Sequence, residues 1–492
     1  MTDPAPLELQ PHATAPIAAR ARKLPGWRAE ELRTTFWLVP CIMVVVALAL
    51  FAITFSIDLA VYHGHLELPY WLRTGSADAG RQVLIAIAAA IMTVIGVVFS
   101  ITILALTLAS QQFGPRMLRT FMRDVGNQVT LGVFVGTFVY SVLALGSITS
   151  TAGGTFVPHL SITVSEALLL LDLGVLIYFI HHIAKSIQLP EVIARIADDL
   201  LTAIDAEFPL SAAAVPVAGR PEVGRSAAEI VHLLDERGAA IPAATSGYLQ
   251  FVAYGQLVKI ASRLDAVIRL SHRPGHFVVE GRPLATVWPG GAAEQVRAAL
   301  TKSHLTGPHR TLSQDPVFAI DQLVEIGIRA LSPAVNDTFT ALTCIDWLSA
   351  GLSRISGRVL SEGVFRDEYG RIRLMEFDPS YPRMVNRAFD KLRQAGRGMP
   401  AVIVRLLDSL NHIAEYTGDP SQRRILLRQA DMILRGAELD IDEPDDLADI
   451  RRRYDGLVAT SRRMTRNGPD IDPAGGGALR GPGDEGPVGS DR

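Results

Sequence analysis

The sequence predicts an α-helical membrane domain of four transmembrane helices, followed by an α+β cytoplasmic domain. Long uncharged apolar stretches are confined to residues 36–189, which is the signature of spans that cross a bilayer. The whole chain, 492 residues at 49% hydrophobic and 20% charged, is too long for one domain and too apolar for a wholly soluble protein. Beyond residue 189, short strand patterns and amphipathic helix patterns follow one another, which predicts a small β-barrel or sandwich and a helical C-terminal part.

Charge and cysteine content exclude several classes of protein. A formal net charge of −3 gives no overall basic field, so we expect no nucleic-acid partner. Cys41 and Cys344 are the only cysteines, too few for a disulfide framework or a cysteine metal site. The motifs GxxxxGK[ST], HExxH, CxxC and GxSxG are absent, and the GxGxxG match at residues 481–486 follows no strand. We therefore predict no catalytic residue, no metal and no cofactor, and we do not expect an enzyme.

The chain begins with a Pro- and Ala-rich arm, residues 1–35, that we expect to be disordered and that ends in a basic cluster. The membrane domain, residues 36–189, starts directly after it. Residues 36–57 carry no charge, and a helix of that length is about 33 Å long, enough to cross the hydrocarbon core. This stretch is the first predicted span.

A stripe of small and polar residues runs along the second predicted span, residues 83–108, and continues in the same helical pattern beyond it. They recur at three-, four- and seven-residue steps and so fall in one sector of a helix: Thr93, Gly96, Ser100, Thr107, Gln111 and Gly114. Such a stripe either lines a pore or packs closely against another helix. The following loop, residues 109–128, is amphipathic, and its basic residues either bind anionic lipid headgroups or form a solvated positive flank: Arg116, Arg119 and Arg123.

The third span, residues 129–149, contains Gly132 and Gly136 in a GxxxG step that would admit a neighbouring helix. The fourth, residues 161–183, contains Glu166 and Asp172. A charge near the bilayer centre costs about 2.5–3.5 kcal/mol, so each carboxylate needs a partner outside its own helix. Asp172 is either an ion- or proton-linked site or a structural hydrogen-bonding group.

Two histidines, His181 and His182, end the fourth span and are interpreted as an interfacial cap, because adjacent helical residues point about 100° apart. Basic residues cluster before the first span and between the second and third spans. The loops at residues 58–82 and 150–160 carry few or none. This distribution predicts a multi-pass inner-membrane protein with both termini in the cytoplasm.

The cytoplasmic region is expected to begin with a helix and linker, residues 190–224. A small barrel-like α+β domain, residues 225–310, and a mainly helical domain, residues 311–464, follow, and residues 465–492 are expected to be a disordered tail. Strands around one helix are predicted at residues 247–282, and a hairpin at 358–377 that turns at 368–370. Periodicity predicts helices at residues 292–305, 317–331, 339–355, 383–395, 400–416, 421–437 and 444–464.

One helix junction is unusually polar. Ser332, Asn336 and Asp337 lie between two apolar helices. They either cap the start of the second helix or form a cytoplasmic polar site.

Two segments carry a resemblance to a known family: Ala-Ser-Gln-Gln-Phe-Gly-Pro-Arg at residues 109–116, and the junction at residues 330–341. With four spans, the chain resembles the bacterial predicted-membrane-protein family catalogued as domain-of-unknown-function family 2254, over about Arg33 to Met464. That resemblance implies an integral membrane protein and brings no activity or catalytic residue with it. Residues 273–284 are similar to a turn of biotinyl- and lipoyl-carrier barrels, but no lysine occupies the modified position.

These patterns predict an oligomeric channel or transport protein. Its second and fourth spans would line a pathway for an ion or small solute, and its cytoplasmic region would gate or assemble it. The alternative is a non-conducting sensor or scaffold for cytoplasmic partners. In either case the expected partners are the lipid bilayer and further copies of the chain.

Overall fold

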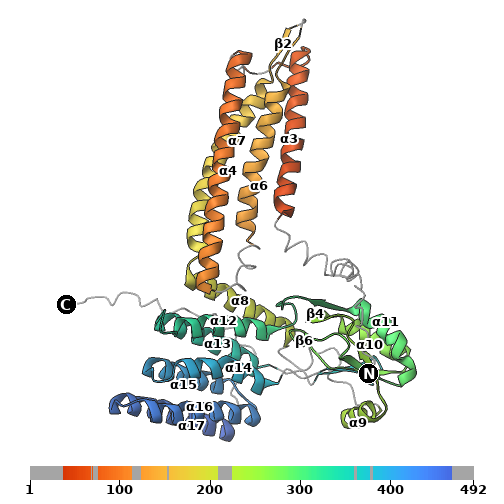
Figure 1. The fold of residues 1–492 in the computed structure, drawn as a ribbon, viewed down its shortest axis with the longest axis vertical. Coiled ribbons are helices and arrows are strands. Elements are labelled where there is room, and N and C mark those ends of the chain that lie inside the picture. The colour runs from red at the N-terminus through yellow and green to blue at the C-terminus, as the bar shows by residue number, and fades with distance from the viewer. Residues whose placement is uncertain are drawn as a thin grey trace, which may run out of the picture. The chain divides into compact units, whose positions relative to one another are not determined.

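The computed structural model describes residues 37–67, 69, 76–113, 124–151, 154–208, 224–358, 363–376 and 380–467. Four long apolar helices come first: α3 (Leu38–Tyr62), α4 (Ala77–Phe113), α6 (Val125–Ser147) and α7 (His159–Ser186). All four are long and apolar enough to cross a membrane, and they lie side by side as a bundle (Figure 1). The predicted four-span domain is confirmed. The basic arm at 1–35 and residues 468–492 of the tail lie outside the described residues.

Helix α6 is the centre of the bundle and packs against α3, α4 and α7. Its Phe134 and Tyr140 are fully buried in two separate apolar clusters. The outward faces of the bundle keep large apolar side chains exposed, such as Leu170 and Ile177, which suits contact with lipid tails. Between α6 and α7 the chain forms a small antiparallel hairpin, β1 (Thr149–Thr151) and β2 (Gly154–Phe156).

The GxxxG step of α6 lies against α3. A Cβ atom on Gly132 would come within 2.9 Å of the Met43 side chain, and one on Gly136 within 3.4 Å of Ala47. The two glycines therefore permit close approach of α3. A Cβ atom on Gly96 of α4 would meet nothing within 4 Å, so the α4 stripe is not the packing partner of this step.

The region after the four spans begins with α8 (Leu189–Glu207) and α9 (Ala227–Arg237) and contains two open sheets. The five-stranded sheet has the order β3 (Ala239–Pro242), β7 (Pro283–Trp288), β5 (Val267–Leu270), β10 (Ile372–Met375), β9 (Val364–Arg366). Strands β10 and β5 pair in parallel, and the other neighbours are antiparallel. The three-stranded antiparallel sheet has the order β6 (Phe277–Val278), β4 (Gly247–Val252), β8 (His304–Gly307).

The two sheets share one apolar core with α10 (Tyr254–Arg263) and α11 (Ala293–Ser303), and a short 3₁₀ turn, η4 (Gly290–Ala292), precedes α11. Both sheets are open rather than closed, so of the two predicted forms the arrangement is sandwich-like and not a barrel. The predicted hairpin turning at residues 368–370 is present as β9 and β10. Because β10 pairs with β5, this hairpin belongs to the sheet region although it lies among helices in the sequence.

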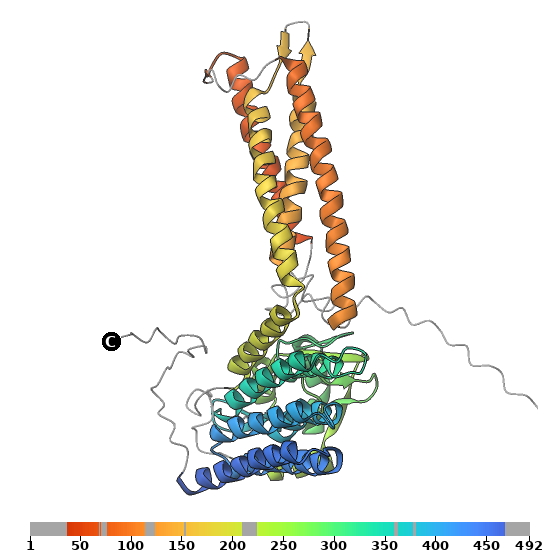
Figure 2. The same cartoon turned by 90° about the vertical axis from the view of Figure 1, so that its left-hand side faces the viewer.

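The helical part comprises α12 (Pro316–Ala330), α13 (Thr338–Ser356), α14 (Tyr381–Ala395), α15 (Pro400–Glu415), α16 (Pro420–Asp440) and α17 (Pro444–Asn467). Helix α15 packs against α13, α16 and α17 (Figure 2). Several of these helices begin with proline, which suits a first turn that needs no amide donor. The predicted helices are confirmed within a few residues at each end, and α17 runs into the stretch expected to be tail.

Candidate functional site

Buried polar side chains form a row on α6 and on α7, and two of its members, Thr137 of α6 and Asp172 of α7, are hydrogen-bonded to each other. On α6 they recur at steps of three, seven and four residues, and on α7 at steps of four and seven, so each set occupies one helix face. We call this row the α6–α7 seam: Asn127, Thr130, Thr137 and Ser141 on α6, with Ser161, Ser165 and Asp172 on α7. Each is at most 4% exposed.

Asp172 lies at the middle of the seam. It is about 20 Å along the helix axis from either end of α7, close to the centre of a hydrocarbon core about 30 Å thick. The Thr137 hydroxyl donates a hydrogen bond to Asp172 Oδ1 at 3.2 Å. The second carboxyl oxygen, Oδ2, is buried and accepts no hydrogen bond from the described residues.

Four further seam residues have buried polar atoms without a hydrogen-bond partner in the described part of the chain: Asn127, Thr130, Ser141 and Ser165. A helical serine or threonine commonly donates to the carbonyl oxygen four residues earlier, yet these hydroxyls do not. A buried polar group left unpaired costs about 1–3 kcal/mol. Native proteins keep few such groups, and they usually mark a function or a site for water or an ion.

At the end of the seam nearest the β1–β2 hairpin, Ser161 is hydrogen-bonded to α3. Asp58 of α3 is 3% exposed and accepts from the amides of Leu160 and Ser161 at 2.8 and 2.9 Å, and from the Ser161 hydroxyl at 2.7 Å. Its carboxylate thus caps the first turn of α7 from another helix. Thr54 and Tyr140 share a hydrogen bond of 2.7 Å beside it. Sequence reasoning missed Asp58 because the first span was ended one residue before it. The available sequence signal was that Asp58 follows Thr54 by four residues, which places the two polar side chains on one helix face.

The opposite end of the bundle is organised by Asp124. Its carboxylate caps α6 by accepting from the Gly126 amide at 2.8 Å. It also lies 2.8 Å from His182 Nε2 and 3.8 Å from Arg195 of α8. Asp124 therefore joins α6, α7 and α8, and His182 has a specific carboxylate partner there. His181, next to it, is exposed.

Two phenylalanines interrupt the seam between Asp172 and Asp124. Phe134 is three residues before Thr137 on α6, and Phe179 is seven residues beyond Asp172 on the antiparallel α7, so both lie on the Asp124 side. They are 0% and 1% exposed and belong to one apolar cluster. A packed apolar pair of this kind excludes water unless the side chains move.

The predicted stripe on α4 faces away from the seam. Thr93, Ser100 and Thr107 are exposed, and each hydroxyl donates to the carbonyl oxygen four residues earlier, at 2.9, 2.8 and 2.9 Å. Gly96 is also exposed. Within one chain, then, the structure does not bring the stripe and Asp172 together. Gly114, the Gln111 side chain and the predicted headgroup-binding arginines lie outside the described residues: Arg116, Arg119 and Arg123.

The remaining predicted residues are placed as follows. Glu166 is half-buried on α7. At the α12–α13 junction Asp337 caps α13, accepting from the amide and hydroxyl of Thr340 at 3.1 and 2.6 Å. Asn336 has a left-handed φ of 51°, and its amide donates to the Ser332 carbonyl at 2.9 Å. The junction thus has the geometry of a capped helix start. Among the described residues no group of three or more His, Cys, Asp or Glu side chains could hold a metal ion.

A family of membrane proteins matches most of this architecture. The family described as Predicted membrane protein (DUF2254) matches residues 33–412, which include all four spans, both sheets and the helices up to α15. The chain belongs to this family. It is a multi-pass membrane protein, and its four spans contact the lipid bilayer.

Two relatives extend the similarity beyond that range. The chain is 33% identical over 426 residues to the Uncharacterized protein Rv1290c of Mycobacterium tuberculosis, covering 85% of this chain and 79% of the relative. The same values hold for the Uncharacterized protein Mb1321c of Mycobacterium bovis. No solved structure matches the chain. Neither relative's name states an activity.

Proposed function

We propose that this protein moves an ion or a proton across the bacterial inner membrane through the α6–α7 seam. The supporting observation is the set of five seam residues whose buried polar atoms have no partner among the described residues. A passing ion with its water would supply those partners, and the unpaired atoms are then groups awaiting a ligand rather than packing defects. The soluble region would act as a gating or assembly domain.

The contrast between seam and stripe favours a path inside one chain. Three of the five seam hydroxyls, those of Thr130, Ser141 and Ser165, are buried and unpaired among the described residues, whereas the stripe hydroxyls of Thr93, Ser100 and Thr107 are exposed and paired to their own helix. Only the seam contains a carboxylate, Asp172, which would screen a cation or accept a proton at mid-membrane. Phe134 and Phe179 would form the gate on the Asp124 side.

The test is flux through liposomes that contain the purified full-length protein. Asp172→Asn keeps the shape of the side chain, so we expect it to fold normally and to lower flux at least tenfold, about 1.4 kcal/mol. Phe179→Ser should raise flux by wetting the gate. Ser100→Ala and Thr107→Val test the stripe in parallel, because a pathway between copies would respond to them and a pathway in the seam would not.

Two results would contradict the proposal. Unchanged flux in a folded Asp172→Asn variant would remove the seam from the pathway. No flux of protons, Na⁺, K⁺ or Cl⁻ in the native protein would favour the second candidate, a non-conducting sensor or scaffold that couples the membrane to cytoplasmic partners.

The proposed orientation has both termini in the cytoplasm, supported by the basic residues before α3 and between α4 and α6. Reporter fusions after Arg73, Val125, Gly154 and Gly224 should report outside, inside, outside and inside. An external reporter at Gly224 would contradict the proposed orientation.

We also propose a homo-oligomer that forms through the exposed α4 stripe, whose small side chains allow another helix to approach. Ser100→Cys in a cysteine-free background should then crosslink between copies, with the lipid-facing Leu170→Cys as the control. A monomer by light scattering in several detergents would contradict this.

A further inference from the structure

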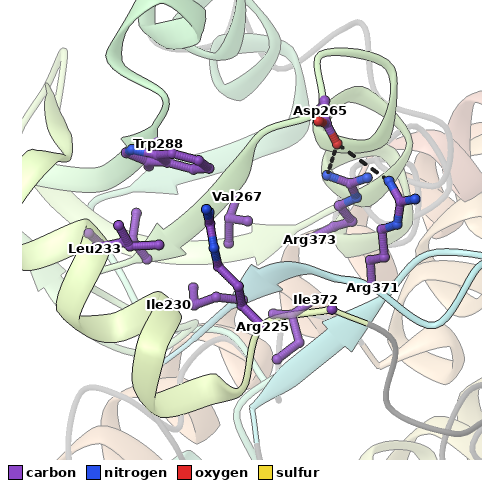
Figure 3. Close-up of a pocket in the computed structure, with 11 residues that line it drawn as sticks. Arg225, Ile230, Leu233, Asp265, Val267, Trp288, Arg371, Ile372 and Arg373 are labelled. Carbon is purple, nitrogen blue, oxygen red and sulfur yellow. Dashed lines mark ion pairs between the residues drawn. The ribbon is translucent and has the colours of Figure 1, made fainter.

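The five-stranded sheet region contains a cavity of about 310 Å³ beside α9. Its walls come from three segments far apart in the sequence: the start of α9, strands β5 and β7, and the β9–β10 hairpin (Figure 3). The volume is at the low end of the range of small-molecule sites, about 300–1,000 Å³. The floor of the cavity is apolar and is formed by Ile230, Leu234, Val267 and Ile372.

The rim of the cavity is basic. Among its eleven lining residues three are arginines and one, Asp265, is a carboxylate. Arg373 is neutralised, because its guanidinium lies 2.7 Å from Asp367 and 2.9 Å from Asp265. Arg371 forms a longer ion pair with Asp265, at 3.8 Å, and its side chain is 53% exposed, so its guanidinium remains accessible to a ligand. Asp265 itself has a left-handed φ of 46°, an uncommon conformation for a non-glycine residue, and its carboxylate faces both arginines (Figure 3).

The other side of the cavity presents a flat aromatic surface. Arg225 reaches from the start of α9 toward Trp288, and its guanidinium lies 4.8 Å from the centre of the indole ring (Figure 3). No carboxylate in the described part of the chain is recorded within ion-pair distance of Arg225. An indole face and a guanidinium plane are the groups on which nucleobases stack, and exposed guanidinium groups bind phosphate oxygens bidentately.

We propose that this cavity binds a nucleotide. The nucleobase would displace the Arg225 guanidinium from the Trp288 ring and stack there over the apolar floor of the cavity, and the phosphate would lie between the displaced Arg225 and Arg371. Asp265 and Asp367 would hold Arg373 in place beneath it. The proposal does not depend on whether the membrane domain conducts, since every residue that carries it belongs to the sheet region.

The experiment is calorimetric titration of the full-length protein in lipid nanodiscs with AMP, GMP, ATP and GTP. Adenosine is titrated to measure binding of the base without a phosphate, and inorganic phosphate is titrated to measure binding of the anion alone. At least one nucleotide should bind with a Kd below about 1 mM, and adenosine and phosphate should each bind at least tenfold more weakly. Arg225→Gln and Arg371→Gln should each weaken nucleotide binding at least tenfold. Arg297→Gln, an exposed arginine of α11 outside the cavity, is the matched control and should bind as the native protein does.

Three outcomes would overturn the proposal. The first is no saturable binding of any of the four nucleotides up to about 5 mM, well above the affinity expected of a specific site. The second is inorganic phosphate binding as tightly as the best nucleotide, which would make the site one for a simple anion. The third is native affinity in both arginine variants. Arg225 and Arg371 are exposed, so their replacement leaves the core intact, and a native melting temperature verifies this.

Discussion

Replacing Asp58 by alanine should destabilise the membrane bundle more than any exposed carboxylate can. The substitution removes one acceptor group and leaves three donors without it: the Leu160 amide, the Ser161 amide and the Ser161 hydroxyl. Each stranded buried donor costs about 1–3 kcal/mol. The Leu160 bond is only partly buried, so water replaces part of it, and we expect a total loss of about 3–5 kcal/mol in the free energy of unfolding.

Graded variants separate the capping role from a general effect of charge. Asp58→Asn keeps one acceptor oxygen and should lose roughly half as much as alanine does. Ser161→Ala removes one donor only and should cost about 1 kcal/mol. Asp78→Ala is the control, because its side chain is 85% exposed at the start of α4, and it should change stability by less than about 0.5 kcal/mol.

The assay is reversible unfolding in mixed micelles with increasing SDS, followed by circular dichroism. The order of stability should be native, then Ser161→Ala, Asp58→Asn and Asp58→Ala. An Asp58→Ala protein within about 0.5 kcal/mol of the native one would refute the reasoning. It would mean that α7 is positioned by its apolar packing and not by the carboxylate of α3.

The remaining predictions concern the region that follows the four spans. Arg373→Met should leave Asp367 buried without its main partner and cost about 3–5 kcal/mol of unfolding free energy, measured by urea titration; a loss below about 1 kcal/mol would show that the pair adds nothing. Burial raises the pKa of the Cys344 thiol to about 12, so maleimide should label it only on unfolding, and rapid labelling of native Cys41→Ser protein would contradict this. Burial also raises the pKa of Tyr381 to about 12, against the lowering effect of its hydrogen bond with Ser356. The stability that neutral Tyr381 contributes to the folded state is therefore fully present below its unfolded-state pKa of about 10. It is lost as the pH rises through its folded-state pKa of about 12. Tyr381→Phe should lack up to about 3 kcal/mol of the alkaline loss of stability seen in the native protein, and identical pH profiles would refute the assignment.

The sequence by itself determined the elements whose pattern is local. Apolar runs long enough to cross a bilayer identify the four spans, and a 3.6-residue period identifies the helices of the C-terminal part. The hairpin at residues 368–370 was predicted because a glycine turn separates two apolar runs. Strands β3, β7 and β8 were missed, as was α9. They are short, and their stability comes from neighbours distant in the chain, as where β3 pairs with β7.

Only the tertiary structure decided which polar face points inward. Both α4 and the α6–α7 pair carry periodic small and polar residues, and periodicity alone places each set on one face without saying what that face meets. In the fold, α4 turns its stripe outward, whereas Asp172 and Thr137 meet between helices. The cavity has the same origin, since Arg225, Trp288 and Arg371 converge only when β10 pairs with β5 and α9 packs against Val267 and Ile372 of those strands. A site is a set of distances between segments, and those distances are fixed by long-range packing and strand pairing, which no local pattern encodes.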